Sequence, residues 1–78
     1  MISAEVAVYP LKTSNATNAI NNSINALQNS NVKFTVNSMN TCLTGKKSEI
    51  FSSLEAMFTE AENSGEISMV VTITNASK

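Results

Sequence analysis

The chain has 78 residues and a mass of 8.3 kDa, so we predict a single small domain over residues 1–78. Charged residues make up only 14% of the chain and the formal net charge is -1, with no arginine, so we expect no nucleic-acid partner. The chain lacks histidine and has one cysteine, Cys42. These counts exclude a histidine-based triad, a Cys/His metal cluster and an intrachain disulfide, and we expect no metal and no cofactor.

The apolar residues form short runs of about four, which is too short to span a membrane. Residues 1–5 contain neither a basic region nor an apolar stretch, so we expect no signal peptide and a reduced, cytoplasmic location. A chain of this length buries only about 60–65% of its unfolded surface. We therefore expect self-association to supply additional buried area.

Residues 2–9 alternate between apolar and mixed side chains, which predicts a half-buried strand. Pro10 lacks an N–H group and is expected to end it. Thr13 or Ser14 can then cap a helix whose apolar face is Ala16, Ile20, Ser23, Ile24 and Leu27 and which ends near residues 29–31.

Two short strands are predicted next, at residues 32–36 and 39–44, with Asn37 and Ser38 as the turn between them. A second helix is expected over residues 47–63, with an apolar stripe of Ile50, Phe51, Leu54, Met57, Phe58 and Ala61. Gly65 suits the left-handed position after this helix, and residues 66–74 alternate as a last strand.

The predicted order is β-α-β-β-α-β, which indicates an α+β, ferredoxin-like sandwich with a four-stranded antiparallel sheet and two helices on one face. The helices leave the other sheet face uncovered. By strand parity this open face displays Ser3, Glu5, Ala7, Tyr9, Lys33, Thr35, Asn40, Cys42, Thr44, Val70, Thr72 and Thr74. Because the face carries few charges, we predict a homodimer or a dimer of dimers formed through sheet faces or edges. A monomer with a solvated sheet is the alternative.

Few residues have the pattern of a catalytic site. Residues 45–48, Gly-Lys-Lys-Ser, resemble the end of a phosphate loop but lack its other required positions, which leaves a weak anion site or a solvated basic turn. Glu5 is the only carboxylate predicted on its strand face. It can accept hydrogen bonds from an aminopyrimidine or an ammonium group, or it can pair with Lys33 or with a partner chain. Cys42 has no predicted base beside it and is expected to be structural. We therefore predict that the protein is not an enzyme.

Two segments carry a further signal: residues 5–13, Glu-Val-Ala-Val-Tyr-Pro-Leu-Lys-Thr, and residues 38–45, Ser-Met-Asn-Thr-Cys-Leu-Thr-Gly. They resemble the first and the third strand of the thiamine-binding (YkoF-like) family. Lys12 stands where that family usually has glycine. The resemblance implies a ferredoxin-like fold, dimers or tetramers, and binding of thiamine or its hydroxymethylpyrimidine part without catalysis.

The third-strand match makes Asn40 and Thr41 the expected pocket residues, because an amide can donate to and accept from an aminopyrimidine edge. Glu5, Tyr9, Met39 and Thr72 are further candidates by location. The alternative function is a protein–protein interaction module that uses the open sheet face and binds no small molecule.

Overall fold

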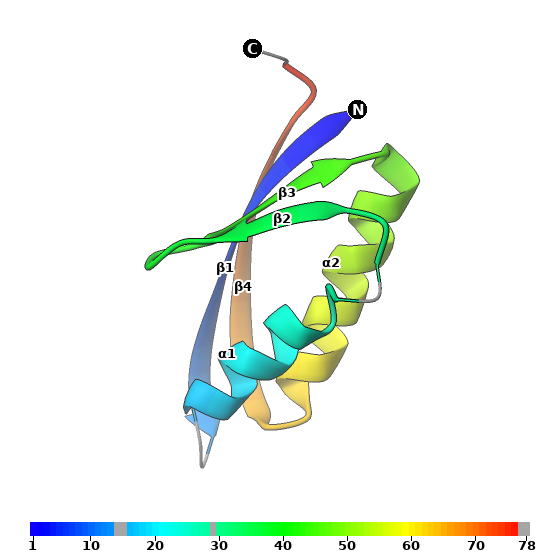
Figure 1. The fold of residues 1–78 in the computed structure, drawn as a ribbon. Coiled ribbons are helices and arrows are strands. Elements are labelled where there is room, and N and C mark those ends of the chain that lie inside the picture. The colour runs from blue at the N-terminus through cyan, green and yellow to red at the C-terminus, as the bar shows by residue number, and fades with distance from the viewer. Residues whose placement is uncertain (14–15, 29, 77–78) are drawn as a thin grey trace.

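The computed structural model describes residues 1–13, 16–28 and 30–76. It contains four strands and two helices in the predicted order (Figure 1). Their bounds are β1 (Ile2–Thr13), α1 (Ala16–Asn25), β2 (Lys33–Val36), β3 (Thr41–Gly45), α2 (Lys47–Glu62) and β4 (Gly65–Thr74). Of the two expected helix caps, Ser14 lies outside the described residues and Thr13 is the last residue of β1. The expected end of the first helix near residues 29–31 is wrong, because α1 ends at Asn25.

The four strands form one antiparallel sheet in the order β2-β3-β1-β4, and both helices pack on the same side of it (Figure 1). The predicted ferredoxin-like fold is thereby confirmed. β1 and β4 are long and pair along nearly their whole length, whereas β3 pairs with β1 only from Ile2 to Val6. The β2–β3 hairpin therefore covers only one half of β1.

The core lies between the sheet and the helices, as the alternating strands predict. Its buried side chains come from every layer: Ala4, Val6, Leu27, Val32, Leu43, Ile50 and Met57. Leu43 and Ile50 are fully enclosed. Each residue of this kind contributes about 1.5–3 kcal/mol when it is removed from water, so this cluster is the main source of stability in a chain of this size.

The prediction that Pro10 ends the first strand is wrong. β1 continues to Thr13, Pro10 stands opposite Ile67 of β4, and the register shifts between Pro10 and Lys12. β3 has already separated from β1 beyond Val6, so this part of β1 has a free side. A proline without an N–H group is tolerated beside such a free side because no partner strand requires the missing donor.

The third strand begins two residues later than predicted, at Thr41. The preceding residues form a turn in which the Asn37 backbone N–H donates to the Asn40 carbonyl at 2.7 Å. Met39 lies in this turn, outside β3, and is 79% exposed.

Both helices bury part of their predicted apolar faces and expose the rest. α1 buries Ala19 and Ser23, while Ile20 is 37% exposed. The buried Ser23 hydroxyl is satisfied because it donates to the Ile20 carbonyl at 2.7 Å. α1 ends at Asn25, and residues 26–28 continue as turns that still bury Leu27.

In α2 the buried residues are Ile50, Ser53, Met57 and Ala61. Phe51 and Phe58, which were predicted to be part of the core stripe, are instead 50% and 40% exposed. Small side chains are buried in both helices, such as Ala19 in α1 and Ser53 in α2, whereas the two rings of α2 keep much of their surface in contact with solvent.

Candidate functional site

The open face of the sheet carries a hollow of about 530 Å³ at the end where both described chain ends lie. Its walls come from β1, β3 and β4. The polar residues that line it are Ser3, Glu5, Cys42, Thr44, Thr72 and Thr74. Met1 and Ala76 also line it. This volume is within the range of small-molecule sites, about 300–1,000 Å³.

Strand register explains why these side chains meet. Glu5 of β1 stands opposite Cys42 of β3 on one side and opposite Thr72 of β4 on the other. Thr35 of β2 extends the same row beyond Cys42. Directly opposed residues of antiparallel strands point to the same face, so this row crosses all four strands on the open side.

A second row lies next to the first. Ser3 of β1 stands between Thr44 of β3 and Thr74 of β4, and the hydroxyl oxygens of Ser3 and Thr44 are 3.5 Å apart. The two rows place hydroxyl groups beside one carboxylate and one thiol. Hydroxyl groups both donate and accept, so the floor can adapt to ligands with either kind of group.

Glu5 is the only charged residue that lines the hollow. Within residues 1–13, 16–28 and 30–76, the structure records no ion pair or hydrogen bond for its carboxylate. Lys33, its predicted alternative partner, stands opposite Thr44 in the neighbouring row. The carboxylate is thus available to a ligand that carries N–H donors or a positive charge.

Asn40 does not line the hollow itself but contacts Cys42, which does. Its side-chain oxygen accepts from the Asn37 amide at 3.2 Å and lies 3.8 Å from the Cys42 sulfur. The Asn37 amide also lies 3.6 Å from that sulfur. These contacts hold the Asn40 oxygen in place, and the described residues show no partner for its NH₂ group.

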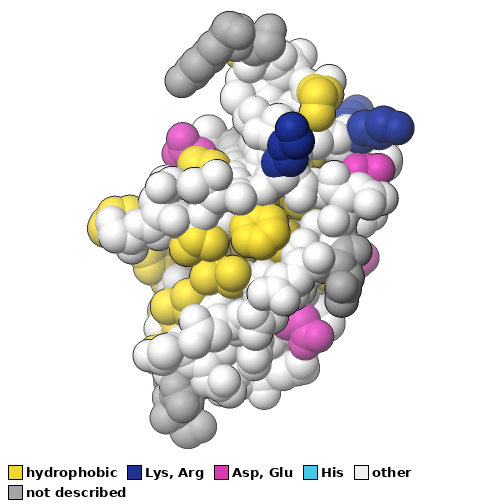
Figure 2. All heavy atoms as spheres, in the orientation of Figure 1, with side chains coloured by type: hydrophobic (Ala, Val, Ile, Leu, Met, Phe, Trp, Pro, Cys, Tyr) yellow, Lys and Arg dark blue, Asp and Glu magenta, His cyan; other side chains and the backbone are white. Residues whose placement is uncertain are grey.

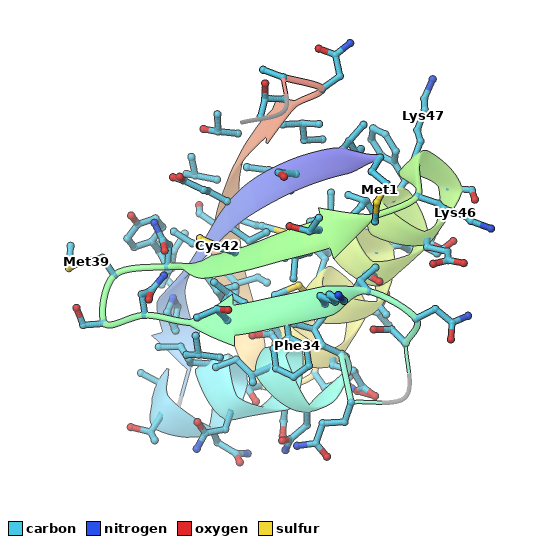
Figure 3. The ribbon with its side chains drawn as sticks, turned by 45° about the horizontal axis from the view of Figure 1, so that its top comes forward. Met1, Phe34, Met39, Cys42, Lys46 and Lys47 are labelled. Atoms are coloured by element: carbon cyan, nitrogen blue, oxygen red, sulfur yellow. The ribbon has the colours of Figure 1, made fainter. Side chains whose placement is uncertain are left out.

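The other sequence-predicted residues lie apart from this hollow. Thr41 stands opposite Val6 and is 6% exposed, so its side chain lies on the helix-covered face. Tyr9 is on the open face but four residues along β1 from Glu5, about 13 Å away. Met39 is at the tip of the β2–β3 hairpin, far from the β3 end that precedes Lys46 and Lys47 (Figure 3). Of the predicted site residues, the structure therefore brings together Glu5 and Thr72, with Asn40 nearby.

The sequence prediction did not select Ser3, Thr44 or Cys42 as site residues. All three are on the predicted open face, but strand parity alone does not distinguish them from the other residues of that face. Cys42 is half-buried beside two amides. Cys42 can be recognised as a site residue only from the pairing of β1 with β3, which places it opposite Glu5.

The described part of the chain gives little support for a metal site, an anion site or a membrane-spanning helix. No group of three His, Cys, Asp or Glu side chains in it could hold a metal ion. Lys46 and Lys47 at the start of α2 are both exposed. This exposure agrees with the solvated basic turn, which was one of the two alternatives for residues 45–48. None of the described helices has the length and apolar character needed to cross a bilayer.

Apolar side chains also gather outside the hollow. Figure 2 shows such a patch between the β2–β3 hairpin and α1, where Ile20, Phe34 and Val36 are each at least partly exposed. Phe34 stands opposite the buried Leu43 of β3 but is itself 36% exposed. This patch borders the short edge strand β2 and is separate from the hollow.

Comparison with solved structures supports the fold. A protein from Streptococcus pneumoniae has a TM-score of 0.88 and 23% identity, with 97% of this chain and 87% of that chain covered. A domain of unknown function from Bacillus cereus has a TM-score of 0.86 and 19% identity, with 96% and 75% covered. A Thermotoga maritima protein, whose name proposes a role in thiamine biosynthesis or salvage, has a TM-score of 0.82 and 17% identity, with 96% and 83% covered.

A search of curated proteins finds no match. The family described as "YKOF-related Family", in contrast, matches residues 1–77, which is nearly the whole chain. The match agrees with the strand motifs around residues 5–13 and 38–45 and with the observed topology. The chain belongs to the YKOF-related family.

Proposed function

We propose that the protein binds thiamine or its hydroxymethylpyrimidine moiety, without catalysis, as a homo-oligomer. The observation that supports this most directly is the unpaired Glu5 carboxylate among hydroxyl groups in the hollow on the open sheet face. An aminopyrimidine has an exocyclic NH₂ group that can donate to a carboxylate, and the thiazolium ring of thiamine is a cation. Both features match a site whose only charged side chain is a carboxylate.

Asn40 extends this recognition to a direct neighbour of the residues that line the hollow. Its oxygen is occupied by Asn37, while its NH₂ group is free among the described residues and can donate to a pyrimidine ring nitrogen. A hydroxymethyl group can exchange hydrogen bonds with Ser3, Thr44 or Thr74. Family membership and the name of the Thermotoga maritima neighbour add support for a thiamine-related ligand.

Assembly is part of the proposal because one copy leaves the hollow open on one side. The open face combines Val70, which is 56% exposed, and Tyr9, which is 50% exposed, with small neutral polar residues. A second copy stacked on this face would remove these side chains from water and would roof the hollow. Buried hydrogen bonds to Glu5 would then gain strength from the lower dielectric.

No catalytic step is proposed. The Cys42 thiol contacts the side-chain amides of Asn37 and Asn40, and neither amide can act as a base. The hollow has one carboxylate, so the paired acid and base of a hydrolase are not available among its lining residues.

Isothermal titration calorimetry with thiamine and with hydroxymethylpyrimidine tests the proposal. We expect saturable heat for both ligands and a loss of about ten- to hundredfold in affinity for Glu5→Gln, since a hydrogen bond to a charged group is worth about 1.5–3 kcal/mol. Glu55→Gln, an exposed carboxylate on α2, is the matched control and should bind like the wild type. The absence of heat with both ligands up to millimolar concentration would contradict the proposal.

A further inference from the structure

The two helices border a pair of adjoining hollows of about 590 and 330 Å³. α1 and α2 lie side by side on the same face of the sheet (Figure 1), and each hollow is lined from both helices or from the turn that follows α1. The hollows share Ala26, Ser52 and Ala56, so they form one elongated depression, which we call the helix groove. The helix groove shares no lining residue with the hollow around Glu5 and is a separate site.

The helix groove is acidic and has no neutralising cation. Glu49 lines the smaller hollow, and Glu55 and Glu60 line the larger one. Among the described residues no lysine lines either hollow, and the chain has no arginine. α1 contains no charged residue and contributes the amides of Asn22 and Asn25. The carboxylates form no ion pair within the described part of the chain, so their mutual repulsion is not compensated there.

A buried hydroxyl group opens into the same groove. Ser53 of α2 is only 5% exposed and lines the smaller hollow. Its hydroxyl has no hydrogen-bond partner among the described residues, whereas the buried Ser23 hydroxyl donates to a carbonyl of its own helix.

The Ser53 oxygen reaches the space of the hollow, because no unpartnered side-chain oxygen of the described, unexposed residues is fully enclosed. Buried polar groups are normally hydrogen-bonded, and leaving one unpaired is unfavourable. The position therefore suits a ligand atom that completes the missing hydrogen bond. This hydroxyl is an observation independent of the acidic residues, and it points to the same groove.

The spacing of the carboxylates favours an extended ligand over a metal ion. Positions 49, 55 and 60 are displaced by about 9 Å and then about 8 Å along the axis of α2, at 1.5 Å per residue. The oxygen ligands of a single Mg²⁺ or Ca²⁺ must converge to within about 2.0–2.6 Å of it. No group of three acidic side chains in the described residues could hold a metal ion. A ligand whose positive charges are distributed along a chain matches the observed spacing.

We propose that the helix groove binds a linear aliphatic polyamine such as spermidine, whose ammonium groups are separated by short methylene chains. The ammonium groups donate to the carboxylates, and one of them donates to the Ser53 hydroxyl, because an ammonium group has donors and no acceptor. The Asn22 amide oxygen on the opposite wall is a further acceptor. The methylene segments lie against the methyl groups of Ala26 and Ala56 in the part that both hollows share.

A polyamine fits this groove better than a basic peptide or a monovalent amine. The shared part of the groove offers two methyl groups and the Ser52 hydroxyl, so a peptide backbone would find few partners for its N–H and C=O groups, which are costly to leave unpaired. An amine with one positive charge can pair with only one of the separated carboxylates. The groove thus selects for the number and spacing of charges.

Isothermal titration calorimetry with spermidine at low ionic strength is the direct test. We expect saturable heat and an affinity that falls as salt is added, because the carboxylates lie at the surface and are screened. Magnesium chloride and butylamine should displace little spermidine at equal concentration. Absence of heat with spermidine, or displacement by either competitor as effective as by spermidine itself, overturns the proposal. A tetralysine peptide that binds more tightly than spermidine would also overturn it, in favour of a protein partner.

Ser53→Ala and Ser23→Ala form a matched pair, because both replace a buried serine in a helix and only Ser53 lines the groove. Ser53→Ala should weaken spermidine binding about tenfold through the loss of one hydrogen bond to a charged group. It should not lower the midpoint of thermal unfolding without spermidine, since the hydroxyl has no partner in the described residues. Ser23→Ala should bind spermidine like the wild type.

Glu60→Gln and Glu62→Gln are the second pair, and both remove one exposed carboxylate from α2. Glutamine keeps an oxygen that can accept the hydrogen bond from Asn63, so Glu60→Gln should fold normally. It should weaken spermidine binding about two- to fivefold, the range for an exposed ion pair, whereas Glu62→Gln should not. Wild-type affinity in Ser53→Ala, or equal losses in Glu60→Gln and Glu62→Gln, would show that spermidine does not occupy the helix groove and would overturn the proposal.

Discussion

Glu5 and Cys42 stand directly opposite each other on adjacent strands, on the face of the sheet that the helices leave open. Both line the same hollow, although they are 37 residues apart in the chain. The pairing joins the only carboxylate that lines this hollow to the only cysteine in the protein. Cys42 can therefore report on ligand binding at Glu5 without the introduction of a foreign probe.

The first prediction uses this thiol. A saturating concentration of thiamine should slow the alkylation of Cys42 by iodoacetamide several-fold, because a ligand held at Glu5 covers the neighbouring sulfur. Mass spectrometry of the intact protein over time measures the rate. In Glu5→Gln the same thiamine concentration should give little protection, and equal rates with and without thiamine in the wild type would place the ligand elsewhere.

The second prediction concerns Thr72, which stands opposite Glu5 on its other side. Thr72→Lys places an ammonium group beside the carboxylate, so it should weaken thiamine binding at least tenfold and should also oppose stacking of the open faces. The residue is exposed, so the free energy of unfolding should change by less than about 0.5 kcal/mol. Calorimetry and urea unfolding measure the two effects, and Thr59→Lys on the exposed side of α2 is the control for added charge.

The third prediction contrasts two residues of the β2–β3 region. Leu43 is fully buried, whereas Met39 at the hairpin tip is 79% exposed. Leu43→Ala should cost about 2–5 kcal/mol of unfolding free energy, since it removes buried methyl groups and leaves a cavity. Met39→Ala should cost less than about 0.5 kcal/mol. Similar losses for the two variants in urea unfolding would contradict the assignment of strand parity.

The topology could be predicted from the sequence because the period-two and helical patterns are strong in every element. Ala4, Val6, Leu43 and Ile50 were all expected in the core, and all are buried. Gly65 was expected to be left-handed after the second helix and has φ 135. These features depend on local alternation and turn chemistry, which a single sequence displays directly.

The errors arise where a neighbour decides the outcome. Pro10 ends a strand only if both sides of the strand are paired, and the early departure of β3 could not be seen in the sequence. Phe51 and Phe58 have core spacing in α2, but the edge position of β4 leaves them without cover from a further strand. Thr41 was selected by its match to the family motif, without regard to the sheet face on which it lies. The strand register places it opposite Val6, on the helix-covered face.

The fourth prediction concerns Gly65, which follows α2 and opens β4. Its φ of 135 is a backbone conformation that side chains with a Cβ atom rarely adopt. Gly65→Ala should therefore lower the free energy of unfolding by about 1–3 kcal/mol through strain. Urea unfolding measures the loss, and Ser64→Ala, one residue earlier, is the neighbouring control.

Gly45, in contrast, is required for space and not for its backbone angle. A Cβ atom added there would lie 3.1 Å from Cγ1 of Val32, a buried side chain just before β2. Gly45→Ala should therefore destabilise the protein by about 1–3 kcal/mol, since neither β3 nor the packed Val32 can move freely. Val32→Ala removes the opposing methyl groups and alone should cost about 1–3 kcal/mol through the cavity that it leaves. The double variant should lose less than the sum of the two single variants, with a coupling of about 0.5–3 kcal/mol in a urea-unfolding cycle. Additive losses would show that the two residues do not compete for the same volume.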